Sequence, residues 1–257
     1  MRELDETAAP LMDHLVELRR RLMWSFGALF AAFGVCFYFA DKILSFLAQP
    51  LIRAFPPGEG KLVYTKLYEA FFVEVRVAFF AAFFLAFPVI ANQIWAFVAP
   101  GLYSKEKRAF LPFLVATPIL FTLGGALAYY IVMPKAFEFF LGYQGNLGGI
   151  QQEALPAIGD YLSLVMHFIL AFGISFLLPV LLMLLERAGV VNRDQLKRGR
   201  RYAILGAFVV SAVATPPDVL SQFMLAIPLI LLYELSLIAI WFTERRRARE
   251  PAGSELV

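Results

Sequence analysis

The chain of 257 residues has little of what a water-soluble protein uses to fold or to react. Its only cysteine, Cys36, can form no internal disulfide. Its two histidines, His14 and His167, are too far apart in sequence to indicate a zinc site. Charged residues make up 17% of the chain, against about 25% in ordinary globular proteins. These shortages exclude a disulfide scaffold, a disordered chain and a soluble enzyme, and we expect neither a metal nor a cofactor.

Apolar residues make up 60% of the sequence, and they gather into runs long enough to cross a bilayer. A transmembrane helix needs roughly 20 apolar residues to span a hydrocarbon core about 30 Å thick. Four charge-free runs meet this requirement, whereas residues 203–215 reach only about 20 Å and form a hairpin with the run that follows. Asp218 is placed to cap the helix after that turn. We expect a single all-α membrane domain, residues 1–257, with spans at 22–40, 77–99, 110–133, 161–185, 203–215 and 219–242.

The basic residues predict the orientation of these six spans. Residues 1–21, 98–109, 186–202 and 243–257 hold four, three, six and four Lys or Arg, which is 17 of the 23 in the chain. All four segments fall on one side of a six-span topology, and basic residues favour the cytoplasmic side. We therefore expect both termini in the cytoplasm and no cleavable signal peptide, and the net charge of +3 reflects topology rather than nucleic-acid binding.

Prolines within the apolar runs have two interpretations: they bend the helices, or they are simply common in membrane helices. Each proline removes one backbone donor and favours a kink. Kinked helices are therefore expected in place of a straight bundle, and apolar residues in the loop 41–69 predict short interfacial helices. The prolines concerned are Pro88, Pro112, Pro118, Pro179 and Pro228.

Two acidic residues, Glu17 and Glu106, stand within basic segments on the predicted cytoplasmic side. One interpretation is structural: Glu17 pairs with Arg20 or Arg21 one turn later, and Glu106 favours the positive end of a helix dipole. The other is that the two carboxylates bind guanidinium groups by charge-assisted hydrogen bonds. Spacing alone leaves both open.

Three runs of sequence stand out as motifs: His14-Leu15-Val16-Glu17-Leu18-Arg19, Asn92 to Tyr103 followed by Glu106 and Arg108, and Thr215-Pro216-Pro217-Asp218-Val219-Leu220-Ser221-Gln222. These runs resemble the TatC family, the polytopic core subunits of twin-arginine protein translocases. Shorter matches are Tyr68-Glu69-Ala70-Phe71 and Ala171-Phe172-Gly173. The matches follow the family's order along essentially the whole chain, and together they are specific.

The resemblance implies a receptor for folded proteins whose signal peptides carry consecutive arginines, with no reaction catalysed. It implies a concave, cup-like bundle of six helices with short fifth and sixth helices, in a prokaryotic cytoplasmic (inner) membrane. Glu17 and Glu106, with Arg19 and Arg108, match the positions that engage the arginine pair. Transport is then driven by the proton-motive force.

The family also implies partners. Thr215, Ser221 and Gln222 match the docking surface for single-span TatA and TatB subunits, and further copies of the chain join the receptor complex. A short fifth helix is expected to thin the bilayer around it. Further polar positions of structural or functional interest are Glu69, Gln93, Asp218 and Glu234.

The fourth span departs from the family pattern. Many relatives carry Phe-Glu-x-Pro there, whereas this chain has Phe176-Leu177-Leu178-Pro179. Leu177 cannot ionise, and His167 falls about 80° away around the helix, so it is a poor substitute. Glu234 has no Lys or Arg within four residues, which predicts a protonated or internally bonded carboxyl, and His167 and Arg76 are expected to be satisfied structural groups.

Two other functions are alternatives to a translocase subunit. A secondary transporter of a small solute would account for the proline-broken helices and Glu234, but no internal repeat is visible and the charges lie at the cytoplasmic edge. An intramembrane enzyme lacks a credible residue set, since Cys36, His167 and Glu234 lie on three separate spans without a motif.

Overall fold

The chain is largely helical. The computed structural model describes residues 3–56, 61–102, 111–148, 150–187, 189–215 and 218–249. Two compact units divide it: residues 1–119 with 141–166, and residues 120–140 with 167–257. The first unit is built around α1 (Glu3–Tyr38) and α3 (Glu69–Leu102), and the second around α9 (Arg200–Ala214) and α10 (Val219–Arg249).

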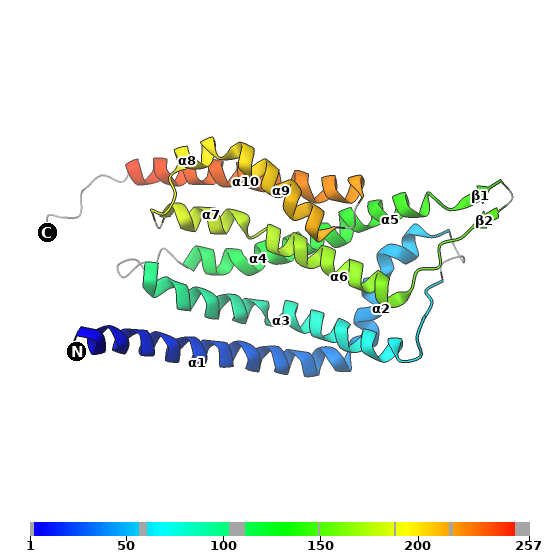
Figure 1. Cartoon of the computed structure of the whole chain (residues 1–257), viewed down its shortest axis with the longest axis horizontal. Helices are drawn as coiled ribbons and strands as arrows, with labels where there is room; N and C mark the ends of the chain where they lie inside the picture. The colour runs from blue at the N-terminus through cyan, green and yellow to red at the C-terminus, as the bar shows by residue number, and fades with distance from the viewer. Residues whose placement is uncertain are drawn as a thin grey trace. The chain divides into compact units, whose positions relative to one another are not determined.

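In the first unit, α1 lies along α3 (Figure 1). Ala78, Ala82 and Ala86 recur every four residues on α3, so they share one face of that helix. They pack against Leu29, Ala32 and Cys36 of α1. Small side chains allow two helix backbones to approach closely, which is how membrane helices associate when lipid removes the hydrophobic driving force between them.

A network of hydrogen bonds connects the start of α3 to other segments of the first unit. Glu69 begins α3, and its Oε2 accepts hydrogen bonds from the Thr65 backbone N–H and hydroxyl at 2.7 and 2.9 Å. Its Oε1 accepts one from the backbone N–H of Gly159 at 3.0 Å. Glu69 therefore joins two segments that are 90 positions apart in sequence. The hydroxyl of Tyr161 adds a bond to the carbonyl oxygen of Leu47 at 2.7 Å.

The connecting segments contain a short helix and a hairpin. The helix expected within residues 41–69 is α2 (Ala40–Ala54). Strands β1 (Gly145–Leu147) and β2 (Ile150–Gln152) pair antiparallel, with Asn146 opposite Gln151.

Prolines shape the remaining membrane-length helices. Between α4 (Leu111–Leu127) and α5 (Met133–Leu141) the helix widens into a π-helical turn, Ala128–Val132, just before Pro134. Between α6 (Ile158–Ser175) and α7 (Leu178–Arg187) it breaks. Pro179 cannot donate to the carbonyl of Ser175, the residue at which α6 ends, so the interruption predicted at this proline is confirmed. The helices continue through Pro88, Pro118 and Pro228.

In the second unit, α7, α8 (Arg193–Arg198) and α9 pack on α10. Leu182 and Leu196 meet Tyr233, Leu237 and Ile240 there. The Tyr233 hydroxyl donates to the carbonyl oxygen of Leu196 at 2.7 Å, which satisfies its polar end in an otherwise apolar core.

Five helical segments are long and apolar enough to cross a membrane. They are His14–Tyr38, Glu69–Phe97, Phe113–Leu141, Ile158–Arg187 and Val219–Arg245, among the described residues. Helix α9, at the position of the expected fifth span, has 15 residues, or about 22 Å of length. A sixth span therefore stays a prediction. The expectation of a short sixth helix is wrong for α10 as a whole, because its 31 residues continue into the basic segment beyond the apolar run.

Candidate functional site

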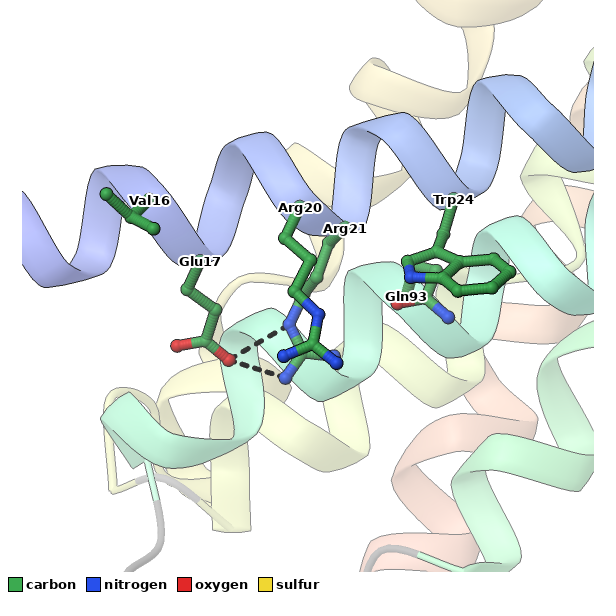
Figure 2. Close-up of a pocket in the computed structure, with 6 residues that line it drawn as sticks. All are labelled: Val16, Glu17, Arg20, Arg21, Trp24 and Gln93. Carbon is green, nitrogen blue, oxygen red and sulfur yellow. Dashed lines mark hydrogen bonds and ion pairs between the residues drawn. The ribbon is translucent and has the colours of Figure 1, made fainter.

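A hollow of about 730 Å³ opens where α1 faces the C-terminal half of α3 (Figure 2). Its α1 residues recur at intervals of three and four, which places them on one face of the helix. The sequence prediction included Glu17 and Gln93 but missed Trp24, which stands two turns after Glu17. The lining residues are Val16, Glu17, Arg20, Arg21, Trp24 and Gln93.

Glu17 is bound to an arginine within the hollow. Its Oε1 accepts hydrogen bonds from two nitrogens of the same guanidinium, Nε of Arg21 at 3.0 Å and Nη2 (Figure 2). Both side chains remain partly exposed. No donor from the described part of the chain reaches the second oxygen, Oε2. The predicted ion pair of Glu17 with an arginine one turn later is therefore confirmed, and Arg21 is the partner. Among the described residues, the second carboxylate oxygen of Glu17 has no donor and is available to another one.

Two neighbours of Glu17 on α1 are exposed. The ring of His14 stacks on Phe97 of α3, with 4.3 Å between centroids, and so fixes the two helices against each other beside the hollow. Arg19 is exposed and is not among the described residues that line the hollow. Glu17 is the acidic residue among the described residues that line the hollow, and Arg20 and Arg21 line it as well.

Glu106 and Arg108, the other predicted members of this site, lie outside the described residues. In sequence, Glu106 follows the end of α3 by four positions. Their placement beside Glu17 stays a prediction.

The polar residues of the α9–α10 turn are mostly buried. The hydroxyl of Thr215 donates to the carbonyl of Ser211 at 2.8 Å, and Ser221 is fully buried with no hydrogen bond to its hydroxyl from the described residues. Gln222 is half-buried, and its Nε2 donates to the carbonyl of Phe208 at 3.3 Å. The predicted cap is confirmed, since Oδ1 of Asp218 accepts from the backbone N–H of Ser221 at 2.7 Å.

Of the two states predicted for Glu234, protonated or internally bonded, the structure shows the internally bonded one. Nη2 of Arg200 lies 2.7 Å from Oε2 of Glu234, so this carboxylate is ion-paired. The partner stands 34 residues earlier, at the start of α9. The sequence within four positions of Glu234 does not contain this partner, because the ion pair forms between two antiparallel helices.

The other residues singled out from the sequence are dispersed. Leu177 is half-buried at the break between α6 and α7, and His167 and Arg76 are exposed on α6 and α3. Their expected role as satisfied structural groups stays a prediction.

Comparison with known proteins identifies the fold and the motifs. The profile of the family described as Sec-independent protein translocase protein (TatC) matches residues 13–228. The chain belongs to the TatC family. TatC proteins are components of protein transport systems, which agrees with the resemblance drawn from the motifs around Glu17, Asn92 and Thr215.

Individual TatC proteins match over nearly the full length. The Sec-independent protein translocase protein TatC of Magnetococcus marinus is 51% identical over 250 residues, covering 97% of this chain and 90% of that protein. TatC of Escherichia coli is 38% identical over 246 residues, covering 95% and 93%. A crystal structure described as the twin arginine translocase receptor TatC is 41% identical with a TM-score of 0.77, covering 90% of this chain and 100% of that one.

Proposed function

We propose that the chain is the receptor subunit of a twin-arginine translocase, and that the hollow at Glu17 receives the consecutive arginines of a signal peptide. The observation that carries the proposal is the state of Glu17 within a TatC-family chain: its carboxylate already holds one guanidinium through a single oxygen. A guanidinium group of a signal peptide would form the same kind of charge-assisted hydrogen bonds. It can bind to the second oxygen of Glu17, Oε2, or replace Arg21 at Oε1.

Arginine is favoured over lysine at such a site. A guanidinium is planar and offers donors in a fixed fork, whereas an ammonium group is a point charge that cannot form the same paired hydrogen bonds. The surrounding Arg19, Arg20 and Arg21 repel any cationic peptide, so only one that forms strong paired bonds gains enough to bind. In this proposal Glu106 provides the second carboxylate, and Arg19 and Arg108 belong to the same cytoplasmic surface.

The remaining parts of the proposal concern topology and partners. Six spans with both termini in the cytoplasm place the basic segments on the side where signal peptides arrive. Single-span subunits of the TatA and TatB type dock on the α9–α10 hairpin. Because Thr215 and Ser221 are buried, Gln222 is the one of the three that offers a polar group at the surface. Folded cargo then crosses the membrane at the expense of the proton-motive force.

The test is binding of a peptide with two consecutive arginines to the full chain in detergent or nanodiscs. We expect Glu17→Gln, which keeps the side-chain shape and removes the charge, to weaken binding about tenfold or more, because a charge-assisted bond is worth roughly 1.5 to 3 kcal/mol. Glu106→Gln should do the same. A peptide with two lysines should bind the wild-type chain weakly and respond little to either change.

Asp194→Asn is the matched control. Asp194 is an exposed carboxylate within a basic segment on the same predicted side, with Lys197 at 3.8 Å. It should leave peptide binding unchanged. Unchanged binding in both glutamate variants, or an equal loss in the Asp194 control, would overturn the assignment of the site while leaving membership of the family untouched.

A further inference from the structure

The second unit contains a cluster of cationic side chains around a tryptophan. Two arginines contact the same indole ring there: the guanidinium carbon of Arg245 lies 4.0 Å from the ring centroid of Trp241, and that of Arg193 lies 5.8 Å from it. Trp241 and Arg245 come from α10, and Arg193 begins α8. These three residues are called the arginine–tryptophan cluster below.

The cluster has unused hydrogen-bond donors. Nη1 of Arg193 faces Oε2 of Glu244 at 3.6 Å, too far for a hydrogen bond, and Nε of Arg193 is buried without an acceptor among the described residues. Arg245 is exposed, and within the described part of the chain no carboxylate pairs with it. The Arg193 side chain as a whole is still 25% exposed, so an additional acceptor can reach this cluster and would be favourable there.

The spacing of the two arginines suits a phosphate. Because they lie 5.8 and 4.0 Å from one ring centroid, their guanidinium carbons are at most 9.8 Å apart. Two arginines this close can both donate charge-assisted hydrogen bonds to one phosphate, and the exposed Arg245 side chain can rotate to do so. The wider charge balance agrees: residues 193–201 with 234–245 hold six basic and three acidic side chains.

The position along α10 indicates a lipid rather than a soluble anion. After Glu234 the sequence of α10 carries no charge until Glu244 and Arg245, so the apolar run of this helix gives way to charged residues at this cluster. Tryptophan and exposed arginine at the end of an apolar helix are typical of the headgroup level of a bilayer. Ile238 precedes Arg245 by two turns on the same helical face and is exposed, which provides an apolar surface for acyl chains below the charge.

We propose that the arginine–tryptophan cluster binds the phosphodiester of an anionic phospholipid. The lipid phosphate lies between Arg193 and Arg245, its glycerol lies at the level of Trp241, and its acyl chains follow Ile238. Such a lipid would hold α8 to the end of α10. The site is independent of signal-peptide binding and of which leaflet the cluster faces.

The test uses Trp241 as its own reporter. In a full chain carrying Trp24→Phe and Trp95→Phe, Trp241 is the sole tryptophan. Its fluorescence is measured in nanodiscs of unlabelled phosphatidylcholine containing a small fraction of acyl-brominated phosphatidylglycerol or acyl-brominated phosphatidylcholine. We expect the anionic lipid to quench Trp241 severalfold more strongly at equal mole fraction. Each arginine contributes about fivefold to this preference, since a basic residue near the membrane surface is worth about 1 kcal/mol with an anionic lipid.

Variants separate the site from a general charge effect. The double variant Arg193→Gln with Arg245→Gln should bring the ratio of quenching by the two lipids close to one. The single variant Arg245→Gln should lower this ratio, and because Arg245 is exposed, it disturbs the fold less than the double variant does. Arg245→Lys should retain most of the preference. Arg53→Gln, an exposed arginine in the other unit, should leave it unchanged.

Three outcomes would overturn the proposal. Equal quenching by the two lipids with the cluster unmutated would show that the cluster does not prefer an anionic lipid, and it would then be assigned to binding an acidic protein segment. Loss of the preference in millimolar inorganic phosphate would assign a soluble anion. An equal decrease in the Arg53 control would show a diffuse electrostatic effect.

Discussion

Single glycines set how closely helices approach in the second unit. A Cβ on Gly124 of α4 would lie 2.5 Å from the backbone carbonyl oxygen of Phe172 on α6, a position that cannot shift without moving the helix. A Cβ on Gly173 would lie 2.8 Å from the ring of Phe121, which is fully buried. The motif Ala171-Phe172-Gly173, first noticed as a family resemblance, is therefore explained by packing.

Gly124→Ala tests this contact. We expect it to destabilise the folded protein by roughly 1 to 3 kcal/mol, because overpacking against a backbone forces a helix to move. Gly206→Ala is the control, since a Cβ on Gly206 of α9 meets nothing within 4 Å and alanine is the better helix former by up to about 1 kcal/mol. Denaturant-induced unfolding in detergent micelles measures both. Equal stability of the two variants would contradict the close approach.

The hairpin of α9 and α10 is held at both ends by polar contacts between helices. Near the turn, Gln222 bonds to the carbonyl of Phe208, and the rings of Phe208 and Phe223 meet edge to face at 5.2 Å. At the far end Arg200 pairs with Glu234. Helix α9 is about 22 Å long, shorter than a bilayer core about 30 Å thick, and these contacts join it to the longer α10.

A double-mutant cycle on Arg200→Ala and Glu234→Ala measures the ion pair. We expect a coupling energy of about 1 kcal/mol or less, because both side chains are more than one-third exposed and solvent screens the pair. Lys197 with Asp194, an exposed pair within α8 at 3.8 Å, gives the reference cycle and should couple more weakly. Zero coupling between Arg200 and Glu234 would mean that the contact does not stabilise the hairpin.

Local features of these elements could be predicted from the sequence, whereas contacts between distant residues could not. Asp218 as a cap, the break at Pro179 and the pairing of Glu17 within one turn each depend on neighbours within four positions. The partner of Glu234 stands 34 positions away, so no local pattern identifies it. Glu69 has a local partner in Thr65, but its bond to Gly159, 90 positions away, could not be predicted from neighbouring residues. The π-helical turn at Ala128–Val132 was missed for another reason: apolar periodicity does not distinguish it from an α-helix.

For the whole molecule, the number of membrane spans depends on whether α9 crosses the membrane together with α10. Asn192 precedes α9, and Ser254 follows α10 in sequence. If both helices cross, cysteines at these two positions react with an impermeant maleimide from the same side. If only α10 crosses, they react from opposite sides.

We expect Asn192→Cys and Ser254→Cys both to be labelled from the cytoplasm, and Asn146→Cys from the outside, because the basic segments 186–202 and 243–257 favour the cytoplasmic side. The background is Cys36→Ala, a small change in the α1–α3 core that removes the only native thiol. Labelling is measured in intact cells and in opened cells. Every cysteine should react in the opened cells. Opposite sides for positions 192 and 254 would reduce the spans to five. Cytoplasmic labelling of position 146 would reverse the orientation, and then Glu17 could not face an arriving signal peptide.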